Sequence, residues 1–479
     1  MSEGRVLPKS VDYTKILPLA VESRSRRRSF FPTNGQSFVD NANNIIRIDV
    51  SASAFLDTKH SYLRFRLTNN SGQAVGFDFG GGHGIIRRLR IEQAGTVLSD
   101  VNHYNKLLSA IVLPSQSGVD GLAHRSLTEG QRFCNQAGNG NSINPAPAAE
   151  VTGAIVNTPS NTAGLVANAA AYTFSIPLMN GLLGTTQDKM VPLQLLGSSP
   201  LTIEIELAPL LDIGAFTAAA PAAGTSYTVD NVRYIAQLVE VGPEVDAQLR
   251  MVQEMSGGKL VLNGTDYTHF NGNIPAGATG NQVVNVPARR KSLKSMFFVG
   301  ASTTYTAPGG GPAGEHSFSY NLSYGGNFNM TDYQVKIGSV VYPPTPIDCQ
   351  FQGAGAALQR SEALTELAKC WGTVSSAHGT GSLSTINTYV ADCDVANMAQ
   401  AAAAGAATNT LRFSPFGIDL EAFQRTAIES GINTASSSLP ISLVLNVGAA
   451  NAEAVNVDCY VSYDSLYFID ETGAIRVSM

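Results

Sequence analysis

The sequence predicts an all-β protein made of antiparallel sandwiches. In residues 62–68, apolar Leu63, Phe65 and Leu67 alternate with polar or cationic residues, so one face of the strand is apolar. Residues 201–207 (LTIEIEL) repeat this alternation more cleanly. The chain has 479 residues. Because sandwiches of about 200–250 residues often form a single domain, this length favours two large β domains.

The first half begins with strand-like segments at 45–50, 62–68 and 84–92. Three strands within about fifty residues, joined by turn residues, are typical of an antiparallel sandwich. Apolar residues then change to helical spacing at Tyr104, Leu107, Leu108 and Ile111. Further strands are expected at 172–177, 201–207 and 231–241. A short charged helix at 244–255 could connect the two halves.

The second half repeats this mixture of strands and short helices. Strands are expected at 260–262, 282–286, 293–299, 334–337, 455–461, 465–469 and 474–477. Residues 342–346 (YPPTP) are a stiff extended run, because proline cannot donate to a ladder. Helical spacing predicts one helix over 364–371 and another over 420–428. Residues 197–203 resemble 436–443, as a duplicated domain would leave behind.

Composition limits the classes of function. Charged residues make up 14% of the chain, below the usual quarter, and the net charge of −6 does not suggest a nucleic-acid binder. Loops rich in Gly and Ala suit packing against neighbours, and residues 114–171 are expected to form an outward surface loop. The five cysteines show no metal-ligand spacing, which favours reduced thiols in a protein assembled inside a cell. Neither a membrane span nor a signal peptide is recognisable.

Residues 1–30 are expected to form an N-terminal arm outside the core. Seven basic residues face three acidic ones there, and Arg24, Arg26, Arg27 and Arg28 form a cluster. One interpretation is a mobile terminus with solvated charges. The other is an arm on the inside of a shell that contacts the genome, membrane headgroups or a neighbouring subunit.

No motif predicts catalysis or a bound cofactor. The seven histidines never occur as His-x-His, and neither His-Glu-x-x-His nor Gly-x-Ser-x-Gly is present. The run 392–394 (DCD) is too short for a calcium loop. Glu204 and Glu206 share one strand face and could form a carboxylate pair, although solvent-facing polar positions explain them better. We therefore expect no enzyme activity, no cofactor and no metal site.

The order of several segments carries a family resemblance. These segments are FLD at 55–57, SYLRF at 61–65, IIRRLRIE at 85–92 and NHYNKLL at 102–108, followed by NMTDYQV at 329–335, YPPTP at 342–346, SGINT at 430–434 and YD at 463–464. Their succession resembles that of double-jelly-roll viral major capsid proteins. The resemblance covers most of residues 40–479 and leaves out 1–30, 114–171 and 375–410.

The resemblance implies two tandem eight-stranded antiparallel jelly rolls with short helices in the loops. The expected divisions are an arm at 1–30, a first jelly roll at 31–247 and a second at 248–479. Such proteins form homotrimers with a near-sixfold outline that tile an icosahedral shell. The implied location is the virion capsid, assembled in the cytoplasm or nucleus of the host cell.

The implied partners are the chain itself, neighbouring trimers, and penton and minor capsid proteins. An internal membrane or the genome is a further implied partner, through the arm. The alternative is a two-domain β-sandwich protein that binds carbohydrate, or a minor spike or penton component of a capsid.

Overall fold

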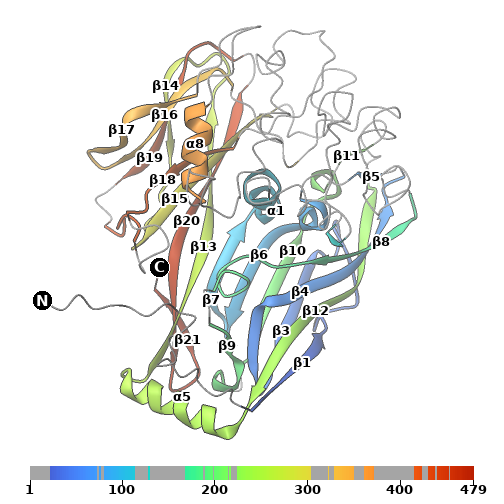
Figure 1. The fold of residues 1–479 in the computed structure, drawn as a ribbon. Helices are drawn as coiled ribbons and strands as arrows, with labels where there is room; N and C mark the ends of the chain where they lie inside the picture. The colour runs from blue at the N-terminus through green and yellow to red at the C-terminus, as the bar shows by residue number, and fades with distance from the viewer. Residues whose placement is uncertain are drawn as a thin grey trace, which may run out of the picture.

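A computed structural model of the chain contains two β sandwiches that lie side by side (Figure 1). It describes residues 22–72, 75–76, 80–113, 128–129, 168–186, 189–197, 199–213, 215–216, 224–303, 322, 328–349, 361–371, 415–422, 430–436, 440–451 and 454–478. The loop expected at 114–171 lies almost wholly outside these residues, as does most of the helix expected at 420–428.

The first sandwich has one sheet in the order β1-β12-β4-β8 and another in the order β3-β10-β6-β7, with β2 and β9 beside the first sheet. A separate two-stranded sheet joins β5 and β11. The strands are β1 Ser23–Phe30, β2 Ser37–Val39, β3 Ile45–Val50, β4 Phe55–Asn70, β5 Val75–Gly76, β6 Ile86–Gln93, β7 Thr96–Asn102, β8 Ala171–Ile176, β9 Val191–Pro192, β10 Leu201–Leu207, β11 Ala215–Phe216 and β12 Ser226–Val241.

The second sandwich has the sheets β13-β20-β15-β18 and β14-β19-β16-β17, with β21 beside β20. All strand pairs in both sandwiches are antiparallel. The strands are β13 Lys259–Ile274, β14 Gly280–Asn285, β15 Leu293–Ser302, β16 Met330–Ile337, β17 Val340–Asp348, β18 Phe416–Asp419, β19 Ile441–Val447, β20 Val455–Asp470 and β21 Ile475–Ser478.

The helices in the described part of the chain are short and lie between strands. They are α1 Tyr104–Lys106, continued by the π-helix η2 Leu107–Val112, α5 Pro243–Met255 and α8 Ser361–Lys369, with 3₁₀ turns η1 Gly81–Ile85, η3 Leu193–Leu195 and η4 Leu210–Asp212. Tyr104, Leu107, Leu108 and Ile111 are all buried, as their spacing predicts. Helix α5 joins β12 to β13 at one end of the molecule (Figure 1). The predicted boundary between residues 247 and 248 falls inside this helix.

Both sandwiches use the same strand order. The sheets β1-β12-β4-β8 and β13-β20-β15-β18 correspond position by position along the chain, as do β3-β10-β6-β7 and β14-β19-β16-β17. Each half also places a helix after its β7 or β17 strand. The segments 197–203 and 436–443 lead into β10 and β19, which hold equivalent places. This is the tandem pair of eight-stranded jelly rolls that the sequence analysis expects, and that prediction is confirmed.

Alternating side chains explain why these segments form strands. In β10, Ile203, Ile205 and Leu207 are at most 1% exposed. The polar residues point the other way, and Glu204 pairs across the ladder with Arg47 of β3. In β17 the ladder to β16 breaks between Tyr333 and Val335, opposite the proline run. Because β17 is an edge strand, its prolines leave few ladder bonds unmade.

The structure differs from the sequence analysis at the end of the expected arm. Residues Ser23–Phe30 form strand β1, which pairs with β12 along its whole length. β1 holds the place that β13 holds in the second sandwich. Its first six residues are exposed. An edge strand exposed on both faces carries no apolar alternation, which is why the sequence pattern resembles an arm.

Candidate functional site

The described residues contain no group of three or more His, Cys, Asp or Glu side chains that could hold a metal ion. None of the helices in this part of the chain is long and apolar enough to cross a membrane. Two other features are candidate functional sites. One is the basic edge strand β1. The other is the contact region between the two jelly rolls, here called the seam, where Ser99 meets Asp266 and Lys106 meets Asp458.

The four predicted site residues all lie on β1. Arg24, Arg26 and Arg28 alternate with Arg27, so three point to one face of the sheet and one to the other. Arg26 forms a 2.6 Å ion pair with Glu240 of β12. Arg27 donates a 2.9 Å hydrogen bond to the Tyr62 hydroxyl. All four residues remain exposed, so the strand presents an excess of positive charge at the margin of the first jelly roll.

The seam contains a fully buried carboxylate, that of Asp266 on β13. Ser99 of β7, in the first jelly roll, donates a 2.7 Å hydrogen bond to its Oδ1 atom. Ser465 and Tyr467 of β20 donate to Oδ2 at 2.9 and 2.6 Å. Burial raises the pKa of Asp266, and these three hydrogen bonds oppose the rise. The carboxylate therefore fastens one jelly roll to the other.

Gly181 allows the chain to pass close to this carboxylate. It has φ +54, and a Cβ there would lie 2.6 Å from the Tyr467 hydroxyl and 2.8 Å from Asp266 Oδ1. Its amide donates a 3.2 Å hydrogen bond to the Thr265 carbonyl. Thr185 donates to the same carbonyl at 2.9 Å. A loop of the first jelly roll is thus bonded directly to a strand of the second.

A second buried charge cluster lies at the seam. Asp458 of β20 is 6% exposed; it pairs with Lys106 of α1 and accepts a 2.8 Å hydrogen bond from His269 of β13. Burial alone would raise the pKa of the Asp458 carboxyl, but Lys106 and His269 outweigh burial and hold it well below its usual range. The His103 ring lies 4.7 Å from that of His269. Burial, reinforced by His269, lowers the pKa of His103 to about 4.

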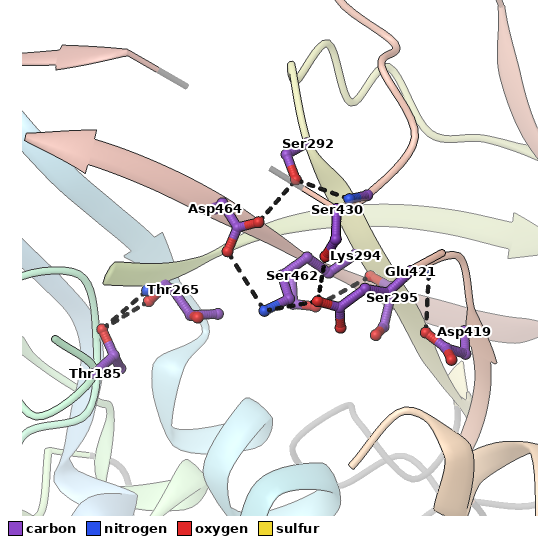
Figure 2. A network of polar contacts seen from close by, with 11 residues as sticks. Thr185, Thr265, Ser292, Lys294, Ser295, Asp419, Glu421, Ser430, Ser462 and Asp464 are labelled. Atoms are coloured by element: carbon purple, nitrogen blue, oxygen red, sulfur yellow. Dashed lines mark hydrogen bonds and ion pairs between the residues drawn. The ribbon is translucent and has the colours of Figure 1, made fainter. Parts of the chain in front are cut away.

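Figure 2 shows the contact of Thr185 with Thr265 across the seam and, beside it, a third polar network that lies within the second jelly roll. The Lys294 ammonium lies between two carboxylates, 3.4 Å from Asp464 Oδ1 and 3.5 Å from Glu421 Oε1. Ser430 donates to Glu421, and Ser292 donates to Asp464 at 2.8 Å. These contacts attach residues 421 and 430 to strands β15 and β20. Lys294 is thus shared by two carboxylates, each of which also accepts a hydrogen bond from a serine. Such an ion-pair network stabilises the fold of the second jelly roll.

Arginine side chains contact both members of the carboxylate pair considered from the sequence. Glu204 accepts a 2.8 Å hydrogen bond from Arg47 Nε and lies 3.9 Å from Arg90 Nη1. Glu206 lies 3.8 Å from Arg87 Nη1. Each carboxylate is therefore held by arginine on the polar face of its sheet. The residues 392–394 lie outside the described part of the chain.

Sequence reasoning missed the residues of the seam. Ser99, Asp266 and Tyr467 are widely separated in the chain, and no local motif connects them. Strands β7 and β13 carry several polar residues each, so Ser99 and Asp266 do not stand out within their own segments. A buried polar group requires a partner, but the sequence marks neither which of these polar residues is buried nor which strand supplies its partner.

No known protein-family model matches the chain, and no curated protein matches it in sequence. Several solved structures are nevertheless similar along nearly its whole length. The Faustovirus major capsid protein has a TM-score of 0.58 at 9% identity, covering 97% of this chain and 92% of that chain. The quasi-atomic structure of the PBCV-1 virus capsid has a TM-score of 0.55 at 9% identity, covering 98% and 99%.

The Sputnik virophage structure has a TM-score of 0.53 at 8% identity, covering 100% of this chain and 93% of that chain. At this identity the likeness establishes the fold. The chain is a double jelly roll of the type found in viral major capsid proteins, and the resemblance seen in its sequence is confirmed.

Proposed function

We propose that the chain is a major capsid protein that forms trimers with a near-sixfold outline, which tile an icosahedral shell. The observation that carries this proposal is the tandem repetition of one jelly-roll topology, with coverage above 90% of both chains in the comparisons with viral capsid structures. Three copies of two equivalent sandwiches present six similar lateral faces. Closed threefold symmetry makes the contacts within such a ring self-consistent.

The hydrogen-bonded seam supports this role. Asp266 joins the two jelly rolls through its buried hydrogen bond with Ser99, and Asp458 joins them through its ion pair with Lys106. A capsomer has to keep its lateral faces at fixed angles, and a seam of this kind holds the two sandwiches in one orientation. The low charge content of the chain also suits loops that become buried between neighbouring subunits.

Light scattering followed by negative-stain microscopy tests the proposal. One chain has a mass of 50.4 kDa, so a trimer of about 151 kDa is expected. Trimers with a hexagonal outline, or closed shells, support the capsid role. A stable monomer that never assembles contradicts it and directs attention to the carbohydrate-binding alternative, which a glycan screen then tests.

We infer further that the basic edge strand faces the inside of the shell and contacts phosphate groups, either of the genome or of membrane headgroups. Exposure of all four arginines supports this inference. Replacing Arg24 and Arg28 by serine should reduce the salt slope of DNA binding by roughly two. The same replacement of Arg250 and Arg476 removes equal charge elsewhere and should leave the slope unchanged.

Binding to vesicles with anionic lipid, measured in parallel with DNA, separates the two sources of phosphate. Equal salt slopes for the two double variants would contradict the inference that β1 contacts phosphate groups. Penton and minor capsid proteins remain expected partners of the assembled trimers. The proposed location is the virion capsid, after assembly inside the host cell.

A further inference from the structure

Helix α5 has an exposed apolar stripe. Ala247, Met251 and Met255 follow one another at four-residue spacing, and Val252 lies beside them. Met255 is 82% exposed, Met251 61% and Val252 50%, and no described residue covers them. The other side of the helix holds it in place, since Gln253 is buried and donates a 3.3 Å hydrogen bond to the Ile469 carbonyl.

The N-terminal segment enters the described structure next to this helix. The Gly242 amide, at the start of α5, donates a 3.2 Å hydrogen bond to the Glu22 carbonyl. Residues 1–21 therefore extend from a point adjacent to the helix. Twenty-one residues reach about 70 Å when extended, whereas a helix of 13 residues is only about 20 Å long. The segment can thus reach every part of the stripe.

The segment 13–21 and helix α5 are complementary in polarity and charge. Residues 13–21 (YTKILPLAV) contain Ile16, Leu17, Leu19 and Val21, and Lys15 is their only charged residue. Helix α5 carries Glu244, Asp246 and Glu254 against a single Arg250. An acidic helix is poorly suited to an anionic membrane surface but well suited to a segment that is apolar and basic.

We propose that residues 13–21 dock on the apolar stripe of α5 in the same chain. Because Glu22 attaches them next to the helix, their effective concentration at the stripe is in the millimolar range, so a weak contact is sufficient. Methionine side chains adapt to irregular partners, which suits a segment interrupted by Pro18. The docked segment would cover apolar surface at the end of the molecule where α5 joins the two jelly rolls.

Cross-linking of the full chain tests this placement. A photoreactive benzophenone amino acid at position 255 should cross-link to the peptide containing residues 13–21. Unlabelled and ¹⁵N-labelled chains are mixed before refolding, and cross-linked peptides should be wholly light or wholly heavy. The same probe at Val283, which is 59% exposed on β14, should not reach this peptide. Mixed-isotope cross-links would assign the stripe to a second copy and overturn the proposal.

Proteolysis provides an independent readout. Tryptic cleavage after Lys15 should be roughly tenfold faster in the double variant Met251→Asp/Met255→Asp, because undocking exposes the site. Val283→Asp adds a charge at an exposed apolar position and should leave the rate unchanged. Because Met251 and Met255 do not pack against the described strands, the double variant should keep the wild-type fold, which circular dichroism checks. Equal cleavage rates in wild type and the double variant would contradict docking.

Discussion

The Ser99 hydroxyl, in the first jelly roll, donates a 2.7 Å hydrogen bond to the buried Asp266 carboxylate in the second. Removing the hydroxyl by Ser99→Ala should lower the free energy of unfolding by about 1–3 kcal/mol, the usual cost of leaving a buried polar group without one of its partners. Asp266→Ala should cost more, because Ser465 and Tyr467 also lose their acceptor. Chemical denaturation of both single variants and the double variant measures the coupling. Additive effects would show that the bond does not join the halves energetically.

Gly181 should not tolerate a side chain. Gly181→Ala combines left-handed backbone strain with contacts of 2.6 and 2.8 Å, and should cost roughly 1–3 kcal/mol beyond the strain itself. Gly277→Ala is a matched control, since Gly277 has φ +77 with open space around its Cβ position. Thermal unfolding of the two variants compares them. Similar melting temperatures would mean that the seam relaxes around a methyl group.

Stability should fall on acidification because of His103. Its pKa is about 4 in the folded chain and about 6.5 when unfolded, so the unfolded chain binds more protons between these values. Lowering the pH from 6.5 to 4 should therefore cost up to roughly 3 kcal/mol of unfolding free energy. His103→Asn should remove this dependence while tolerating φ 50. His60→Asn replaces an exposed histidine and is the control. This variant should keep the wild-type fall in unfolding free energy between pH 6.5 and pH 4.

Acidification to a lower pH range should remove the stabilisation that the Asp458 carboxylate provides. The pKa of its carboxyl is depressed in the folded chain, so its contribution is present above the unfolded value of about 3.9 and is lost as the pH falls further. Asp458→Asn should flatten the stability curve below about pH 4. Urea unfolding from pH 5 to pH 2 measures this. A curve as steep as that of the wild type would exclude Asp458 as the group responsible.

Ile205→Asp should yield insoluble protein. Ile205 is fully buried in the first jelly roll, and an uncompensated charge there is strongly destabilising. Val283→Asp introduces the same side chain at an exposed strand position and should remain soluble. The soluble fraction after expression distinguishes the two variants. Soluble, assembled Ile205→Asp protein would mean that the faces of β10 are assigned the wrong way round.

Two N-terminal deletions should behave differently. Removing residues 1–21 leaves β1 intact and should preserve the fold. Removing residues 1–28 deletes most of β1 and exposes the edge of β12 to uncontrolled strand pairing. Size-exclusion chromatography should show aggregation only for the longer deletion. If both deletions assemble normally, β1 contributes little to the first jelly roll.

Local patterns in the sequence are sufficient to predict the class of fold and the faces of its central strands. Alternation in β4 and β10, and helical spacing from Tyr104 to Ile111, are local properties that survive in any tertiary context. The internal similarity of 197–203 and 436–443 correctly indicated duplication, because equivalent strands have similar turns before them.

The place of β1 and the composition of the seam depend on contacts between distant parts of the chain, which local patterns do not specify. β1 is a strand because β12 offers it an edge, and its exposed arginines carry no periodic signal. Ser99 and Asp266 lie 167 positions apart, and they meet because the two jelly rolls pack together. A buried polar residue needs a partner, but its own neighbours in the chain do not specify which distant strand supplies it.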